Sequence, residues 1–320
     1  MTDVVLAVDI GGTKTAVALV DRAGTILDGL TAPTPALDGP EAVVRTVADL
    51  GGLLVRRASA DARLCGLGVA TAGVVDVRAG RIVSSTDTMA RWAGTPLAAR
   101  VREALGALLA EGAEVHVQND VDAHAVGEFR HGAAHGARSA LIVAVGTGVG
   151  AGIVLDGRVL RGARHVAGEI AHVPVPGAEH LRCPCGRAGH LEAIGSGVGM
   201  HRHYVSLGGD AAVPDARGIV ALARDGDPVA RRALDDSAAA VGRAVAGAVT
   251  LLDPELVVVT GGVAQIGADW WHPMTAALGA EVIDVLSDVP VVPGALAGEA
   301  PLRGAAASVW ELVDERAVAA

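Results

Sequence analysis

Lysine is almost missing from this sequence: Lys14 is the single lysine among 320 residues. Arginine brings the basic total to 26, against 36 acidic residues, so the formal net charge is −10 at pH 7. A surface that binds the phosphate backbone of nucleic acid needs concentrated positive charge. The charge balance therefore argues against nucleic acid as a partner, and it draws attention to the glycine turn that holds the lysine.

Cysteine and long apolar runs are also scarce. Cys65 lies in an apolar segment, and only Cys183 and Cys185 stand close together, so no disulfide framework of a secreted protein is present. No apolar run reaches the roughly 18 residues that span a membrane. The first residues, MTDVVLAVDIGG, show neither the basic flank nor the cleavage site of a signal peptide. We expect a cytoplasmic protein without a membrane partner.

Hydrophobic residues make up 51% of the chain and charged residues 19%, which predicts a packed globular protein long enough for two domains. Residues 4–30 are typical of strand, glycine turn, strand, turn, strand, and residues 139–161 repeat this pattern. The repeat predicts two related α/β domains that face each other across a cleft. Further strands are predicted at 64–76, 114–120 and 255–263, and helices at 40–58, 96–110, within 192–225, and at 227–252, 266–285 and 303–318.

The stretch 166–192 concentrates residues that bind metals. Cys183 and Cys185 are one residue apart, with His172 before them and His190 after them. Two thiolates and two imidazoles in a Gly/Pro-rich loop are suitable ligands for tetrahedral zinc. The alternatives are a surface loop with inert thiols or a disulfide, which one intervening residue would strain. Further imidazoles nearby are His180, His201 and His203.

Two carboxylates bracket this metal-binding pattern. Glu169 precedes His172 by three residues, and Glu192 follows His190 by two. A metal ion that fixes the loop would also hold both carboxylates at fixed positions, as the recognition of hydroxyl groups requires.

Each copy of the repeat contains a glycine turn between strands. Asp9 precedes the turn Gly11, Gly12, Thr13 and Lys14, and the second copy has Gly146, Thr147 and Gly148. Backbone N–H groups of such a turn cradle phosphate, and an adjacent carboxylate holds Mg²⁺. The first turn lacks the spacing and the following helix of a Walker P-loop. Its alternative interpretation is an ordinary hairpin turn.

Asn119 and Asp120 lie where a predicted strand meets a predicted helix. Asn and Asp are preferred helix N-caps, which gives the pair a purely structural interpretation. The functional interpretation makes Asp120 a general base, with Asn119 beside it to hold a substrate.

These motifs resemble the signature of the ROK family (repressors, open reading frames and sugar kinases). Residues 168–172, GEIAH, are similar to the family's G-E-x-G-H, and residues 183–192, CPCGRAGHLE, to its C-x-C-G-x-x-G-C-x-E. DIGGTK at 9–14 and the strand ending in Gly261 and Gly262 resemble the phosphate and adenosine motifs. The chain departs from the family pattern at four places. Ala171 replaces a glycine, and His190 replaces the third cysteine. Thr71-Ala72 stands where the family has a proline, and Thr88-Met89 stands where it has Asn-Leu before the tryptophan, which is Trp92 here.

The resemblance implies an α/β protein with two ribonuclease-H-like (actin/hexokinase-type) domains and a central cleft. It places a small domain at 1–118, a large domain with the zinc loop at 119–302, and a helix at 303–318 that packs back on the first domain. It also implies an ATP-dependent hexose kinase with Mg²⁺ and structural Zn²⁺, assembled as a homodimer or homotetramer.

Site residues follow from the same resemblance. Asp120 is expected to take the proton of the sugar 6-hydroxyl. The expected sugar-binding residues are Asn119, Glu169, His172 and Glu192. The expected zinc ligands are His172, Cys183, Cys185 and His190. The expected ATP and phosphate contacts are Asp9, Gly11, Gly12, Thr13, Lys14, Gly146, Thr147, Gly148, Gly261 and Gly262.

Glucose is the first expectation for the acceptor sugar. Thr88 and Met89 leave room for a bulkier 2-substituent, so N-acetylglucosamine or N-acetylmannosamine is the alternative, followed by fructose. A sugar-responsive transcriptional regulator is the rival from another class. Such a protein needs a DNA-binding module ahead of the first hairpin, whereas here the first strand is predicted near Val4.

Overall fold

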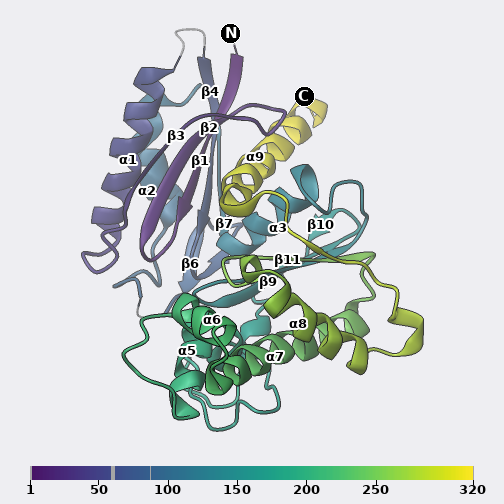
Figure 1. The fold of residues 1–320 in the computed structure, drawn as a ribbon. Coiled ribbons are helices and arrows are strands. Elements are labelled where there is room, and N and C mark those ends of the chain that lie inside the picture. The colour runs from purple at the N-terminus through teal and green to yellow at the C-terminus, as the bar shows by residue number, and fades with distance from the viewer. Residues whose placement is uncertain (1, 59–61, 87, 320) are drawn as a thin grey trace. The chain divides into compact units, whose positions relative to one another are not determined.

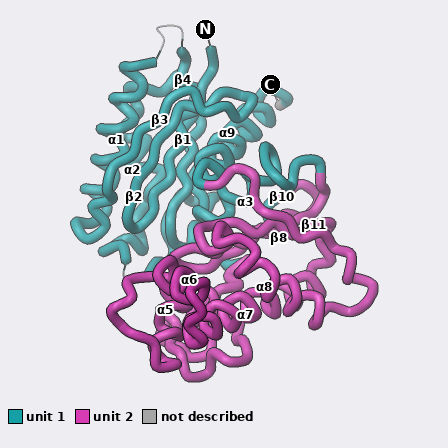
Figure 2. The backbone as a smooth tube through the Cα atoms, viewed as in Figure 1, with its two compact units in different colours: residues 1–136, 159–167, 298–320 teal, residues 137–158, 168–297 magenta. Residues whose placement is uncertain are grey.

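The computed structural model describes residues 2–58, 62–86 and 88–319. By their contacts these residues form two compact units, shown in different colours in Figure 2. Unit 1 comprises residues 1–136, 159–167 and 298–320, and unit 2 comprises residues 137–158 and 168–297. Within the part of the chain that the structure describes, no helix is both long enough and apolar enough to cross a membrane.

Unit 1 is built on a five-stranded sheet in the order β3-β2-β1-β4-β7 (Figure 1). Strands β1 (Thr2–Ile10), β2 (Lys14–Val20) and β3 (Ile26–Pro33) are antiparallel neighbours, as expected of strands joined by short turns. Strands β4 (Ala62–Thr71) and β7 (Glu114–Asn119) continue the sheet in parallel with β1. A separate hairpin is formed by β5 (Val74–Asp76) and β6 (Arg81–Ser84).

Helices cover both faces of this sheet, which explains why β1 is apolar at consecutive positions. Leu6 and Val8 pack in one core with α1 (Pro40–Arg57) and α2 (Leu97–Leu105). Val5 and Ala7 point to the opposite face, where the core includes residues of α3 (Asp120–His131) and α9 (Ala300–Ala319). Successive side chains of a strand alternate between faces, so a continuous apolar run fits a strand buried on both sides.

Helix α9 approaches the sheet closely because β4 has glycines beneath it. A Cβ atom on Gly68 would lie 2.2 Å from the carbonyl oxygen of Ala305, and one on Gly66 would lie 2.3 Å from a side-chain carbon of Val309. The sequence therefore fixes the depth at which this helix packs. Helix α9 contacts β1, β4 and β7, and it belongs to the same unit as the N-terminal strands.

Unit 2 repeats the plan of unit 1. Its five-stranded sheet has the order β10-β9-β8-β11-β12, with β8 (Ala140–Val145) antiparallel to β9 (Val149–Leu155) and parallel to β11 (Leu256–Thr260). The edge strands are β10 (Arg158–Val159) and β12 (Val291–Pro293). In both sheets a meander of three strands continues into two parallel strands, which confirms the internal repeat.

The helices of unit 2 are α4 (Glu192–Gly195), α5 (Gly197–Ser206), α6 (Ala216–Arg224), α7 (Pro228–Leu252) and α8 (Ala268–Glu281). Asp227 caps α7: its side chain accepts hydrogen bonds from Val229 N and Ala230 N, and Pro228 is the first helical residue. Single 3₁₀ turns occur at Gly106–Leu108, Ile170–His172, Ala264–Ile266, Asp284–Leu286 and Ala297–Glu299.

The units divide the chain at other places than the domains predicted at 1–118 and 119–302. Helix α3 belongs to unit 1, since it packs along α9. Residues 159–167 also belong to unit 1, where Arg161 donates a 3.0 Å hydrogen bond to Gln118 and lies 3.6 Å from Asp122. Neither association has a local sequence signal.

Candidate active site

The first glycine turn connects β1 to β2 in unit 1. Gly11 N donates to the carbonyl oxygen of Lys14, and Thr13 accepts from Thr34 N, so the turn is held on two sides. Gly12 is exposed and is followed by exposed Thr13 and Lys14. A well-held turn with exposed amides is a suitable phosphate cradle.

Asp9 is the last carboxylate before this turn, and it is largely withdrawn from water. Burial raises the pKa of Asp9 from 3.8 to about 6, although the Lys14 ammonium acts in the opposite direction. Mg²⁺ prefers carboxylate oxygens, and a bound cation would remove the cost of ionising this one. The donor set therefore fits a metal-bound phosphate near the first turn.

Asn119 and Asp120 have separate tasks at the start of α3. The Asn119 side-chain oxygen accepts from Val121 N and Asp122 N, and its amide donates to Gly73 O and to Asp120. Asn119 is thus the N-cap, and Asp120 is the first helical residue with a half-buried carboxylate. The structure gives the capping role to Asn119 and leaves Asp120 in a position where negative charge interacts favourably with the helix dipole.

Thr88 lies close to the first glycine turn. A Cβ atom on Gly12 would lie 3.7 Å from Thr88 Cβ, and the Thr88 hydroxyl is 2.8 Å from that of Thr86. Met89 is buried, so its side chain supports the loop from below. The buried indole of Trp92 donates to the Ala72 carbonyl at 3.2 Å. The backbone N–H of Trp92 also donates to the Met89 carbonyl at 3.4 Å, so Trp92 contacts both Ala72 and Met89, two positions where the chain departs from the family pattern.

In unit 2, the four predicted zinc ligands converge. Ligand atoms of His172, Cys183, Cys185 and His190 all lie within 4.8 Å of one another. Nδ1 of His172 is 3.6 Å from Cys183 Sγ, and Nδ1 of His190 is 3.3 Å from Cys185 Sγ. Zn–S and Zn–N bonds of about 2.3 and 2.0 Å put ligand atoms of a tetrahedral site roughly 3.3–3.8 Å apart. The donor set fits zinc, and all three cysteines of the chain are free thiols, which excludes the disulfide.

The other imidazoles predicted near this loop have different partners. His180 pairs with the Ser206 hydroxyl at 3.2 Å, and His203 pairs with Asp236 at 2.9 Å. His201 lies apart from both, on the wall of a cavity described below.

The two carboxylates that bracket the metal-binding loop interact with each other electrostatically. Burial raises the pKa of Glu169, and the negative charge of Glu192 adds to this, whereas His172 lowers it. Glu169 lies 3.6 Å from His172 Nε2, the nitrogen that faces away from Cys183. Glu192 reaches the second glycine turn: its carboxylate is 3.4 Å from Val149 N and would meet a Cβ on Gly148 at 3.2 Å. Unit 2 therefore places predicted hydroxyl-binding groups beside a predicted phosphate loop.

The second glycine turn opens onto a cavity of about 610 Å³. Gly146 and Thr147 form one part of its lining, and Gly262 forms another. Residues from α5, α6 and the segments before them complete the walls. The volume is within the range of small-molecule sites, about 300–1,000 Å³.

Gly261 and Gly262 differ in role although the sequence treats them alike. Gly261 has a φ of +95° and would bring a Cβ within 2.3 Å of the Val145 carbonyl oxygen, so it is required for backbone packing. Only Gly262 of the two lines the cavity, and a Cβ there would meet open space.

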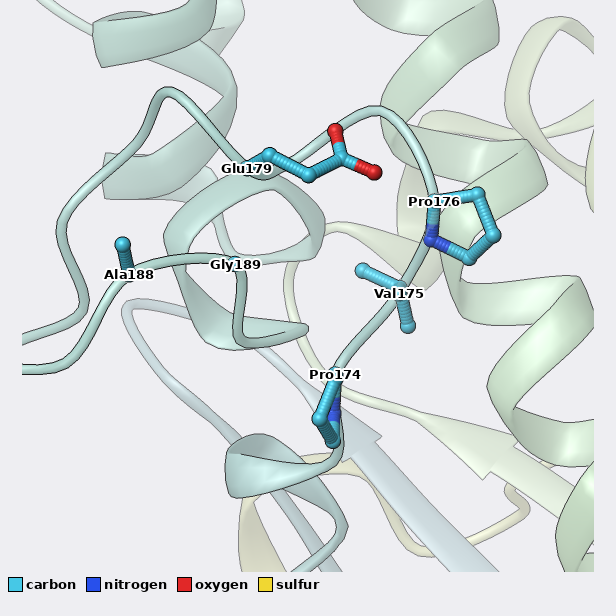
Figure 3. Close-up of a pocket in the computed structure, with 6 residues that line it drawn as sticks. All are labelled: Pro174, Val175, Pro176, Glu179, Ala188 and Gly189. Carbon is cyan, nitrogen blue, oxygen red and sulfur yellow. The ribbon is translucent and has the colours of Figure 1, made fainter.

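A second cavity of about 470 Å³ is lined by residues 174–189 of the metal-binding loop (Figure 3). Two prolines and a valine form much of its wall, and Glu179 supplies a carboxylate. That carboxylate accepts a hydrogen bond from Gly177 N within the same loop, and backbone hydrogen bonds lower its pKa. The Glu179 carboxylate therefore stabilises the conformation of the loop that carries it.

Two sheets of identical strand order, each with a glycine turn after its first strand, define a protein of the actin/hexokinase-type fold. A family model described as "ROK family" matches residues 5–311. This chain belongs to the ROK family.

Among relatives, the bifunctional enzyme NanE/NanK of Brucella melitensis is 40% identical over 261 residues, which cover 81% of this chain and 45% of that protein. The chain thus spans about half the length of that relative. A glucokinase of Halalkalibacterium halodurans is 31% identical, over 84% of this chain and 83% of that one. The solved structure of a ROK family glucokinase from Streptomyces griseus, in complex with glucose and AMPPNP, superposes with a TM-score of 0.80 at 29% identity, covering 96% and 99% of the two chains.

Proposed function

We propose that this protein catalyses the ATP-dependent phosphorylation of a hexose at its 6-hydroxyl, with glucose as the preferred acceptor. The observation that carries the proposal is the contact of Glu192 with Gly148 and Val149. It joins the group of hydroxyl-binding candidates to a phosphate loop within one unit. Membership of the ROK family and the likeness to two glucokinases support the same reaction.

In this mechanism Asp120 takes the proton of the 6-hydroxyl as the oxygen attacks the γ-phosphate. Its place at the first position of α3 suits the task, because Asn119 fixes the local backbone while the carboxylate stays half-buried. Asn119, Glu169, His172 and Glu192 are the proposed hydroxyl partners.

The phosphate groups are assigned to the two glycine turns. The first turn offers Gly11, Gly12, Thr13 and Lys14, and the second offers Gly146, Thr147 and Gly148. Asp9 would hold Mg²⁺, and the ion would supply positive charge beside the phosphoryl oxygens. Gly262 is proposed to pass close to the nucleotide, while Gly261 holds the backbone behind it.

Zinc is proposed as a structural ion held by His172, Cys183, Cys185 and His190. Coordination through His172 Nδ1 leaves Nε2–H as a donor directed toward Glu169. The ion would therefore fix the orientation of a sugar-binding imidazole as well as the fold of the loop.

A second candidate acceptor is an N-acetylhexosamine. Thr88 is exposed and lies against Gly12 of the first phosphate turn, where the family has a longer asparagine. A shorter side chain there leaves space for a 2-acetamido group. A site that bonds particular hydroxyls rejects analogues that lack them, because buried polar groups are left unpaired.

The test is a coupled assay of ADP release against a panel of hexoses. We expect the highest kcat/KM for glucose. A higher kcat/KM for N-acetylglucosamine or N-acetylmannosamine would replace glucose by the second candidate, and Thr88→Asn would then be expected to restore glucose. No phosphoryl transfer to any hexose would refute the kinase itself. Sedimentation of the same preparation tests whether the protein is the expected homodimer or homotetramer.

A further inference from the structure

The cavity of unit 2 has mainly apolar walls with one imidazole among them. Val198, Pro214, Val263 and Ile266 supply apolar surface, and His201 supplies the ring. Val198 is 41% exposed, although its helix α5 packs against α4 and α7. An apolar surface beside a phosphate loop is suited to the flat base of a nucleotide whose phosphates lie on that loop.

We propose that His201 selects adenine as the base of the nucleotide, by accepting a hydrogen bond from the 6-amino group at Nδ1. This inference rests on the proposed function, since it concerns the donor nucleotide of the same reaction. It assigns a specificity-determining residue that neither glycine turn supplies.

The hydrogen bond on the other side of the ring fixes which nitrogen is the acceptor. Nε2 of His201 lies 2.6 Å from the carbonyl oxygen of Val213. A carbonyl oxygen only accepts, so Nε2 carries the proton and donates. In a neutral imidazole the remaining nitrogen, Nδ1, is then an acceptor. Among the residues that the structure describes, no hydrogen-bond donor to this Nδ1 is found.

Base selection follows from that single lone pair. Adenine presents an amino group at position 6, which donates, whereas guanine and hypoxanthine present an oxygen, which repels a second acceptor. A purine with hydrogen at position 6 offers no donor there. The expected order of donors is therefore the adenine nucleotide first, the 6-H purine second and the guanine nucleotide last.

Two charged side chains of the cavity lining give outcomes that the test separates from that of His201. The Asp215 side chain caps α6 through Oδ1, which accepts from Arg217 N and Gly218 N. Its Oδ2 is a second acceptor, and selection of the 6-amino group by Asp215 would survive the replacement of His201. The Arg217 side chain only donates and would favour an oxygen at position 6. If Arg217 rather than His201 selects the base, the test would show a preference for GTP over ATP.

The first experiment changes the nucleotide and leaves the protein intact. Purine riboside 5′-triphosphate, which lacks the 6-amino group, is compared with ATP and GTP in the hexose assay. Loss of one hydrogen bond is expected to lower kcat/KM about tenfold, with a larger loss for GTP. Values for ATP and the 6-H analogue within twofold of each other, or a preference for GTP, would overturn the proposal.

The second experiment replaces the ring. His201→Phe keeps an aromatic surface but removes the acceptor, so the ratio between ATP and the 6-H analogue is expected to fall to near one. His272→Phe, at an exposed histidine of α8 outside the cavity lining, is the matched control and should keep the wild-type ratio. A purely structural role of His201 would slow both nucleotides equally and preserve the ratio, which contradicts the proposal.

Binding separates this inference from the proposed function. Calorimetry with ADP and purine riboside 5′-diphosphate measures base selection without turnover. Equal affinities, with hexose phosphorylation intact, refute the role of His201 alone. Stronger binding of ADP with no phosphorylation of any hexose supports base selection and refutes the kinase.

Discussion

Single residues of the candidate site show how one local fold supports two tasks. Asn119 caps the helix by accepting from two backbone amides of α3. The Asp120 carboxylate accepts from the Asn119 amide and from Val121 N, the next backbone amide. The cap is worth about 1 kcal/mol to a helix, whereas a general base is worth about 10² to 10⁴ in rate. Substitutions at these neighbours therefore separate stability from chemistry.

We expect Asp120→Asn to lower kcat at least about 10²-fold while the KM for the hexose changes little. The amide keeps the size of the side chain but accepts no proton. Melting temperature is expected to stay near the wild-type value, because Asn119 holds the cap. A variant that keeps a tenth of the wild-type kcat would show that Asp120 is not the base.

In the metal-free protein, Asp9 is expected to make the free energy of unfolding depend on pH. Burial raises its pKa in the folded state to about 6, from 3.8. The folded state then binds more protons than the unfolded state between these values, so stability falls as the pH rises from about 4 to 6. We expect Asp9→Asn to raise the free energy of unfolding by roughly 2–3 kcal/mol at pH 7.5 and by less than about 1 kcal/mol near pH 4.

Denaturant titrations without Mg²⁺ at both pH values measure this difference. Asp288→Asn, at an exposed carboxylate, is the control and should change stability little at either pH. A gain for Asp9→Asn that does not depend on pH would mean that ionisation of the buried carboxyl is not its cause.

At the scale of elements, the metal-binding loop and the long helices have different sources of order. The loop from Ile170 to Leu191 has a few turns and bridges but no long helix or strand, so a metal ion would supply much of its rigidity. Helices α7 and α8, in contrast, are held by close packing. A Cβ on Gly242 of α7 would lie 2.2 Å from the Met274 carbonyl oxygen of α8.

One zinc ion per chain is expected by elemental analysis of protein purified without added metal. His190→Cys should keep the ion, because it restores a thiolate ligand of the family. His190→Ala should lose it and also weaken hexose binding, since His172 and Glu192 would no longer be held. His272→Ala serves as the control, and wild-type protein free of stoichiometric zinc would refute the assignment.

A pair of glycines within α7 tests the packing. Gly242→Ala is expected to destabilise unit 2 by about 1–3 kcal/mol, because the methyl group forces α7 and α8 apart. Gly247→Ala meets nothing within 4 Å and is expected to stabilise by up to about 1 kcal/mol through helix propensity. Thermal unfolding of both variants measures the contrast, and equal effects would mean that the approach of α8 is not the constraint.

The elements were largely readable from the sequence, whereas their contacts were not. Glycine turns and β-branched runs marked β1, β2 and β3, and Asp227-Pro228 marked the start of α7, because these signals are local. The cavity wall joins Thr147, His201 and Gly262, which are far apart along the chain, so no local signal connected them. The different roles of Gly261 and Gly262 likewise depend on the approach of Val145.

At the scale of the whole molecule, unit 1 is assembled from both ends of the chain. The core on one face of its sheet contains Val5 and Ala7 from β1 together with Leu302, Ala306 and Val309 from α9. The last part of α9, in contrast, is mostly exposed, and its contacts include ion pairs such as Arg22–Asp314 and Arg316–Glu114. Exposed ion pairs contribute little, so the two halves of α9 differ in importance.

Two truncations test this difference. A chain that ends at Trp310 is expected to keep the fold with a loss of about 1 kcal/mol or less for each ion pair removed. A chain that ends at Ala297 lacks the apolar cover of the sheet, and its β1 and β4 amides are expected to exchange rapidly with solvent. Protected β1 amides in the shorter chain would show that α9 is dispensable for unit 1.

The place of α9 in the chain also sets the order of events on the ribosome. Residues 1–136 leave the ribosome early, yet the helix that covers one face of their sheet is made after residue 299. The 163 residues between these points (299 − 136) take roughly 8–33 s to synthesise at about 5–20 residues per second, and the apolar face stays uncovered for that time. Unit 2 is complete in sequence before then, so we expect it to fold first and the N-terminal sheet to depend on chaperones during synthesis.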